Sequence, residues 1–213
     1  MPKRRDFLTS LTLAAATIAF DRDEASAETS SRAWDTSWID SLAKAKYRVV
    51  FNGSDIADGA ALDYTSTFFD HFHEVHDTPD VDTRPVIVFR RLGTVMALND
   101  AMWDRYSIGV DRKVDDPITK APARRNPFWS APAGDRHAAT SIQSLQKSGL
   151  ICLACNVSLM SMGYSFGQKT GRDAAEVAKE LRENLVPGAI VVPSGIFALI
   201  RAQNAGCAFM QGT

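Results

Sequence analysis

The chain has 213 residues, 45 % of them hydrophobic, with 24 Lys and Arg against 25 Asp and Glu, a net charge of −1. This near-neutral balance argues against nucleic acid or an anionic membrane as the main partner. The length predicts one domain whose hydrophobic core is large enough to fold without disulfides or structural metals. The three cysteines cannot all pair with one another.

The first 27 residues have the features of a twin-arginine signal peptide. Arg4 to Leu8 match the R-R-x-F-L pattern, and an apolar stretch at 8–20 is too short to remain as a membrane anchor. Ala25-Ser26-Ala27 supplies an A-x-A cleavage site. We therefore predict a periplasmic protein that engages the twin-arginine translocase and keeps no membrane anchor after cleavage. The alternative is an amphipathic first helix of a cytoplasmic domain.

The polar residues 28–45 predict an N-terminal arm, followed by one α/β domain at 46–213. That domain opens with a β-rich run at 46–51, after which the segment 59–76 has helical period. A non-alternating apolar run at 85–89 is typical of a strand buried on both faces. A further helical pattern covers 94–106.

An irregular insertion is predicted at 107–136, where four prolines and scattered charges interrupt every period. A helix at 138–148 and a third apolar strand at 150–155 restore the regular pattern. Thr170 to Asp173 then resemble a capping box that opens an amphipathic helix.

The C-terminal residues complete the alternation of strands and helices. They contain a fourth strand at 188–192, a helix capped by Ser194 and ended by Gly206, and a fifth short strand at 207–210. Such alternation predicts a three-layer α/β/α sandwich around a mostly parallel five-stranded sheet.

Polar and nucleophilic side chains follow the first four predicted strands: Asn52, then Arg90 and Arg91, then Cys155 and Asn156, then Ser194. The carboxyl ends of parallel strands share one edge of the sheet, which is where ligands bind. A helix N-terminus and a nearby arginine favour the thiolate form of Cys155. These residues predict a nucleophilic or sulfur-carrying cysteine. The alternative is a small buried residue that happens to end a strand.

Residues 149–163 (GLICLACNVSLMSMG) and 185–195 (LVPGAIVVPSG), together with 198–206 and the final strand, resemble the DsrE/DsrF-like family. The resemblance implies a flavodoxin-like sandwich, usually oligomeric, in which several members carry sulfur as a persulfide on the cysteine that matches Cys155. The chain departs from the dedicated relay members after that cysteine, in the insertion and in its predicted export. From the resemblance we expect a homo-oligomer that handles a small sulfur-containing or anionic ligand.

Other residues suggest alternative functions. Arg124 and Arg125, ahead of Phe128 and Trp129, have the composition of a lid tip that holds an anion, which would suit a non-catalytic binding module. The alternative for this segment is a surface loop folded against the domain. On the helix at 59–76, three side chains are spaced for nitrogen and oxygen ligands of a metal: Asp70, His73 and Asp77. A charged outer helix face explains these three equally well. The leading hypothesis requires no cofactor and no metal.

Overall fold

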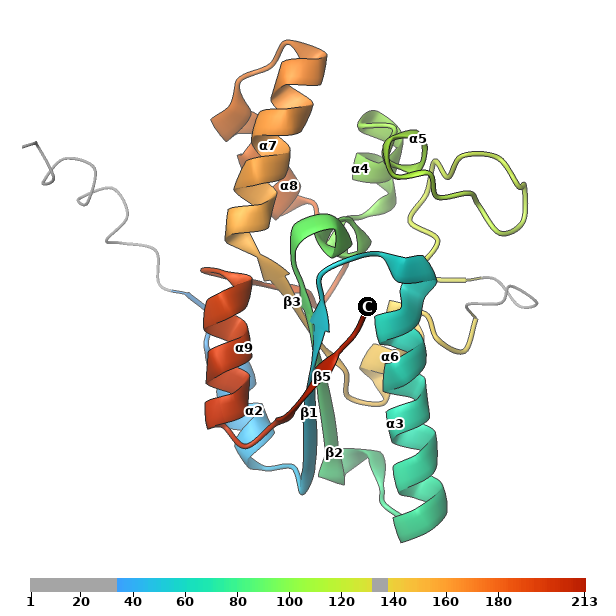
Figure 1. The fold of residues 1–213 in the computed structure, drawn as a ribbon, viewed down its shortest axis with the longest axis vertical. Coiled ribbons are helices and arrows are strands. Elements are labelled where there is room, and N and C mark those ends of the chain that lie inside the picture. The colour runs from blue at the N-terminus through green and yellow to red at the C-terminus, as the bar shows by residue number, and fades with distance from the viewer. Residues whose placement is uncertain (1–33, 132–137) are drawn as a thin grey trace, which may run out of the picture. The chain divides into compact units, whose positions relative to one another are not determined.

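The computed structural model describes residues 34–131 and 138–213 (Figure 1). The predicted signal peptide and residues 28–33 of the predicted arm lie outside the described residues. From Trp34 onward the described residues belong to one structural unit. None of the helices in this part of the chain is long and apolar enough to cross a membrane.

A five-stranded sheet forms the centre of this unit, in the order β4-β3-β2-β1-β5 with every neighbouring pair parallel. The strands are β1 (Tyr47–Gly53), β2 (Thr83–Phe89), β3 (Ile151–Cys155), β4 (Ile190–Val192) and β5 (Ala208–Gln211). This arrangement confirms the predicted α/β/α class. Flavodoxin itself has the order 2-1-3-4-5, so the likeness to flavodoxin extends to the layers and not to the strand order.

Helices cover both faces of the sheet and bury two separate apolar clusters. Successive residues of a strand point to opposite faces, so Phe51 lies in one cluster and Val50 in the other. The larger cluster is covered by α3 (Ala60–His76), α4 (Asp100–Arg105), α6 (Ile142–Lys147), α7 (Asn156–Thr170) and α8 (Ala174–Glu183). The smaller cluster is covered by α2 (Ser37–Ala43) and α9 (Gly195–Asn204).

A buried parallel sheet requires that the central residue of each strand be buried, and one strand departs from this expectation. Val49, Ile87 and Leu153 are buried, whereas Val191 is only partly buried. Val191 lies on β4, which pairs with β3 alone because it forms an edge of the sheet. An edge strand has a neighbour on one side only, so its side chains keep more contact with water.

The part of the arm that the structure describes belongs to the sandwich. Its helix α2 places Trp38 and Leu42, four residues apart, on the apolar cluster beneath α9. Burying each of these side chains is worth about 1.5–3 kcal/mol. The sequence pattern missed this helix because only two apolar residues of a seven-residue element are buried.

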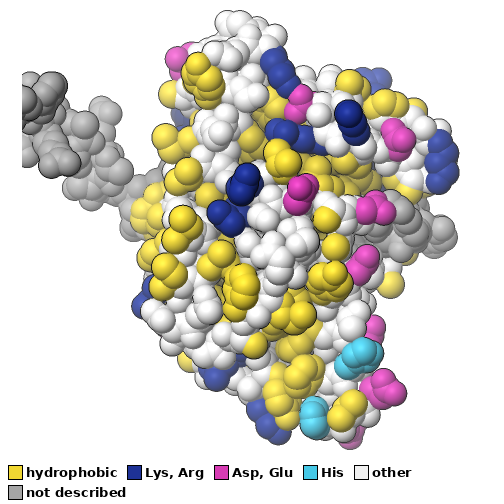
Figure 2. Space-filling view, in the orientation of Figure 1, with side chains coloured by type: hydrophobic (Ala, Val, Ile, Leu, Met, Phe, Trp, Pro, Cys, Tyr) yellow, Lys and Arg dark blue, Asp and Glu magenta, His cyan; other side chains and the backbone are white. Residues whose placement is uncertain are grey.

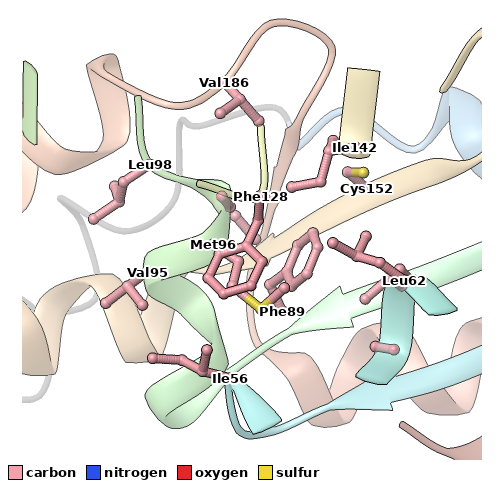
Figure 3. Packing of buried hydrophobic residues seen from close by; sticks show 14 of the residues in the cluster. Ile56, Leu62, Phe89, Val95, Met96, Leu98, Phe128, Ile142, Cys152 and Val186 are labelled. Atoms are coloured by element: carbon pink, nitrogen blue, oxygen red, sulfur yellow. The ribbon is translucent and has the colours of Figure 1, made fainter. Parts of the chain in front are cut away.

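The insertion is anchored to the core through the part at 107–131, which includes α5 (Ile108–Arg112). Phe128 is buried, and its ring centroid lies 6.2 Å from that of Trp103. Figure 3 shows Phe128 beside Met96 within the larger cluster. The buried amide of Asn126 donates to the carbonyl oxygens of Met96 and Leu98, at 2.8 and 2.7 Å. This segment is therefore a fixed part of the domain, although its sequence has no period.

Several predicted boundaries are displaced because local capping decides them. The expected helix at 94–106 is divided into a 3-10 helix, η3 (Arg91–Ala97), and α4, whose N-terminus is capped by Asn99. The cap of α8 is Asp173 rather than Thr170, which is the last residue of α7. Two further 3-10 helices, η1 (Ala57–Gly59) and η2 (Asp80–Asp82), flank α3.

Candidate functional site

The chain leaves two neighbouring strands, β3 and β4, toward opposite faces of the sheet. β3 continues directly into α7, which packs on the larger cluster, whereas β4 leads to α9 on the smaller one. In Figure 1, α7 rises beyond the sheet edge while α9 runs back along the sheet. In open parallel sheets, ligands bind at such a reversal of connection, outside the carboxyl ends of the strands.

Cys155 occupies this position. It is the last residue of β3 and the N-cap of α7. Its Sγ accepts one hydrogen bond from the amide of Ser158 in α7, at 3.4 Å, and one from the amide of Gly195 in α9, at 3.1 Å. The residue is only 4 % exposed. Two helix N-termini thus direct their amides at one sulfur atom, an arrangement that stabilises negative charge.

Arg90 lies next to this sulfur site, and Asn52 contacts Arg90 from β1. Arg90 donates from Nη1 to Oδ1 of Asn52 at 3.3 Å, and Asn52 donates in turn to Gln211 at 2.9 Å. The Arg90 side chain passes close to Gly195, where an added Cβ would lie 2.9 Å from Cδ of Arg90. The structure therefore brings together Arg90, Asn52 and the glycine whose amide binds the sulfur.

The other residues predicted for this edge have different partners. Asn156 accepts a hydrogen bond from Arg182 at 3.2 Å, which directs its amide toward α8. Ser194 caps α9 by accepting from the amide of Phe197 at 3.0 Å, as the sequence predicted. Arg91 lines a neighbouring pocket with Leu92. Asn156 and Ser194 thus support the two helices that present the amides.

Arg124 and Arg125, predicted to form an anion-binding lid tip, lie in an acidic setting. They line a pocket together with Asp100, Asp104 and Asp116. Nε of Arg124 is 2.6 Å from Asp104, and Nε of Arg125 is 2.7 Å from Asp116. The Arg124 hydrogen bond lowers the pKa of Asp104, so that carboxylate stays charged beside its partner. Carboxylates already neutralise these two cations, so the pocket offers little electrostatic attraction to an anion.

The three cysteines are free thiols in three different settings. Burial raises the pKa of Cys152 to about 12, and it raises the pKa of Cys207 to about 11 despite the nearby Arg48. Both thiols therefore remain protonated near neutral pH. Cys152 belongs to the larger apolar cluster, and because side chains alternate along a strand it lies on the opposite face of β3 from Cys155. Cys155 alone among the three accepts hydrogen bonds from two helix N-termini.

The alternative of a metal on α3 finds no support within residues 34–131 and 138–213. No group of three His, Cys, Asp or Glu side chains there is arranged to hold a metal ion. Nε2 of His73 lies 2.8 Å from a carboxylate oxygen of Asp80, and Asp70 accepts from Ser66. Asp70 and His73 therefore belong to the polar outer face of α3, whereas Asp77 ends the helix as its C-cap.

Sequence reasoning missed three residues here: Ser158 and Gly195, whose amides donate to the sulfur, and Arg112, which lines the same pocket as Arg91. The first two follow from helix capping, because an N-cap side chain accepts from the amide three residues ahead and Gly195 opens the helix that Ser194 caps. Arg112 carried no signal, since it lies in an insertion without any period.

No family model matches the chain, and no curated protein matches it. A solved structure that does match is "Structure of Protein of Unknown Function MTH1491 from Methanobacterium thermoautotrophicum". It is 18 % identical, the match covers 78 % of this chain and 98 % of that chain, and the TM-score is 0.41.

Proposed function

We propose that this protein carries sulfur as a persulfide on Cys155. The observation that supports this most directly is the pair of amides, from Ser158 and Gly195, that donate to its Sγ. Thiolates are the nucleophilic form of cysteine, and amide dipoles at helix N-termini favour them. The resemblance of residues 149–163 to the DsrE/DsrF-like family supports the same proposal.

Thiosulfate is the donor that this site favours, because a buried sulfur is more accessible to a small molecule than to another protein. The Cys155 thiolate attacks the outer sulfur of thiosulfate, and the S–S bond of thiosulfate breaks. The electron pair of that bond leaves on sulfite, while Cys155 retains the transferred sulfur as a persulfide anion. Atoms and charge balance without an oxidant.

Arg90 supplies positive charge for this step. A thiolate and a thiosulfate dianion repel one another, and a guanidinium group beside Gly195 offsets that repulsion. Asn52 holds Arg90 in place through its hydrogen bond to Nη1. Asn156 and Ser194 contribute by fixing the helices that carry the amides.

The proposal places the sulfur carrier in the periplasm as a homo-oligomer. Arg4-Arg5 and the A-x-A site at 25–27 support export through the twin-arginine translocase. Self-association is supported by apolar side chains that α7 and α9 expose to solvent, namely Val157, Met160, Tyr164, Ile196 and Ile200. Figure 2 shows apolar side chains along the side of the molecule that these helices form.

Intact mass spectrometry after incubation with thiosulfate at pH 7 tests the proposal. We expect a gain of about 32 Da that reducing agent reverses, together with release of sulfite. The Cys155→Ser variant should show neither, whereas Cys207→Ser, also a buried cysteine, should behave like the wild type. Loading that persists in Cys155→Ser, or a wild type that takes up no sulfur and releases no sulfite, would refute the proposal.

A further inference from the structure

A pocket of about 470 Å³ lies beside the carboxyl edge of the sheet, where η3, α5 and α7 meet. Its lining includes two arginines and three serines, namely Arg91, Arg112, Ser158, Ser161 and Ser165. The serines are three and seven residues apart on α7, so one face of that helix presents hydroxyl groups. Among the described residues, no carboxylate lines this pocket.

The pocket has an excess of positive charge. Within residues 34–131 and 138–213, the Arg91 guanidinium makes no hydrogen bond or ion pair. Nε of Arg112 is buried and lies 3.2 Å from Asp111, without the alignment of a hydrogen bond. Asp111 also pairs with Lys169. Asp111 therefore serves two cations, Arg112 and Lys169, and it does not line the pocket.

The backbone at Arg91 is strained in a way that is typical of binding sites. Its φ of 50° lies in the left-handed region, which costs a non-glycine residue about 1–2 kcal/mol. The Arg91 amide donates to Oγ of Ser158 at 2.7 Å, and the Arg90 amide donates to the carbonyl of Gly53 at 3.0 Å. These two hydrogen bonds hold the strained turn and keep the exposed Arg91 side chain at the pocket.

Apolar side chains complete the lining: Leu92, Val157 and Met162. We propose that this pocket binds a small organic anion. Its oxyanion group lies between Arg91 and Arg112 and accepts from the hydroxyls of Ser161 and Ser165, while its apolar body contacts Leu92 and Val157. Guanidinium groups are the side chains best suited to carboxylate, sulfonate and phosphate oxygens. The volume is within the range of small-molecule sites.

This pocket is separate from the sulfur site, and the inference does not rest on sulfur transfer. Cys155 does not line it. Ser158 lies between the two, because its side chain borders the pocket while its amide donates to the Cys155 sulfur. Anion binding and sulfur loading can therefore be measured independently of one another.

Titration calorimetry with benzenesulfonate and with sulfate tests the inference. We expect benzenesulfonate to bind at least tenfold more tightly than sulfate, because only benzenesulfonate has an apolar body. Arg112→Gln should weaken benzenesulfonate binding by at least tenfold, since it removes a charged partner of the oxyanion. Arg124→Gln is the matched control, because Arg124 pairs with Asp104 in another pocket, and it should bind like the wild type.

Two further variants distinguish loss of anion binding from a folding defect and from an effect at the sulfur site. Ser165→Leu fills the pocket from a half-buried helix position, and it should abolish binding while the far-UV circular dichroism is unchanged. Cys155→Ser should bind benzenesulfonate normally whether or not the wild type carries sulfur. No heat from benzenesulfonate at millimolar concentration, or unchanged binding in both Arg112→Gln and Ser165→Leu, would overturn the proposal.

Discussion

Gly195 combines two roles at the residue scale. Its amide donates to Cys155 Sγ, and its lack of a side chain leaves room for Arg90, whose Cδ would lie 2.9 Å from a Cβ at this position. The backbone of Gly195 is not in the left-handed region, so alanine is tolerated there conformationally. A substitution can therefore displace Arg90 while the amide and the thiol both remain.

We predict that Gly195→Ala slows sulfur loading from thiosulfate by roughly tenfold, because small displacements of a positioning group reduce rates by factors of this order. Stopped-flow detection of sulfite release measures the effect. Gln203→Ala on the same helix is the control, since that side chain is exposed and belongs to no proposed site, and it should leave the rate unchanged. An unchanged rate in Gly195→Ala would show that the position of Arg90 does not matter.

The sequence predicted which residues follow the strands but not where their side chains point. Cys155 ends β3 and Ser194 caps α9, as the apolar runs and capping preferences indicated. Asn156 instead accepts from Arg182, which is 26 positions later in the chain. Such long-range partners depend on helix packing, which no local pattern encodes.

At the element scale, a group of polar side chains joins α4 to α8. The Tyr106 hydroxyl donates to Glu180 at 2.8 Å, and both Arg172 and Arg105 pair with the same carboxylate. Although burial opposes ionisation, the hydrogen bonds from Arg172 and Tyr106 hold the pKa of Glu180 below its usual value. Burial and Glu180 raise the pKa of Tyr106 to about 12, so its hydroxyl remains a donor over the working range.

We predict that Glu180→Gln lowers the free energy of unfolding at pH 7 by about 1–3 kcal/mol, the usual effect of removing a charged hydrogen-bond partner. A carboxyl with a lowered folded pKa stabilises the protein above its unfolded pKa, and this stabilisation is lost as pH falls through the folded pKa. The difference between Glu180→Gln and wild type should therefore shrink from pH 5 to pH 3.

Urea unfolding at pH 7, 5 and 3 measures that difference. The matched control is Glu183→Gln on the same helix. Glu183 is exposed, and its Oε1 lies 4.0 Å from Nζ of Lys179, so this ion pair is long and solvated. This control should change stability by less than about 0.5 kcal/mol. Equal losses in the two variants would show that the group around Glu180 does not tie α4 to α8.

Elements were predictable where one pattern determines them. The central strands are continuous apolar runs, and all of them were found within a few residues of their ends. The division of 94–106 into η3 and α4 depends on the Asn99 cap, and α2 depends on an apolar surface that α9 supplies. The packing of Phe128 likewise depends on Trp103, which precedes it by 25 positions.

At the scale of the whole molecule, α7 and α9 both expose apolar side chains to solvent on one side of the domain. Val157, Met160 and Tyr164 of α7, and Ile196 and Ile200 of α9, are between 53 % and 62 % exposed. An amide from the first turn of each helix donates to the Cys155 sulfur, so these two first turns are neighbours. Exposed apolar side chains that gather on one side of a soluble protein mark a candidate interaction site. It supports the proposed self-association.

We predict that Met160→Glu weakens self-association by at least tenfold, measured by sedimentation velocity over a range of micromolar concentrations. In a two-fold interface each substitution occurs twice, so two carboxylates are introduced into one apolar contact and must lose water when it forms. Val110→Glu is the control, because Val110 is at least as exposed as Met160 but lies on α5, outside this surface. A wild type that sediments as a monomer throughout would refute self-association. A Met160→Glu variant that assembles like the wild type would place the contact on another face.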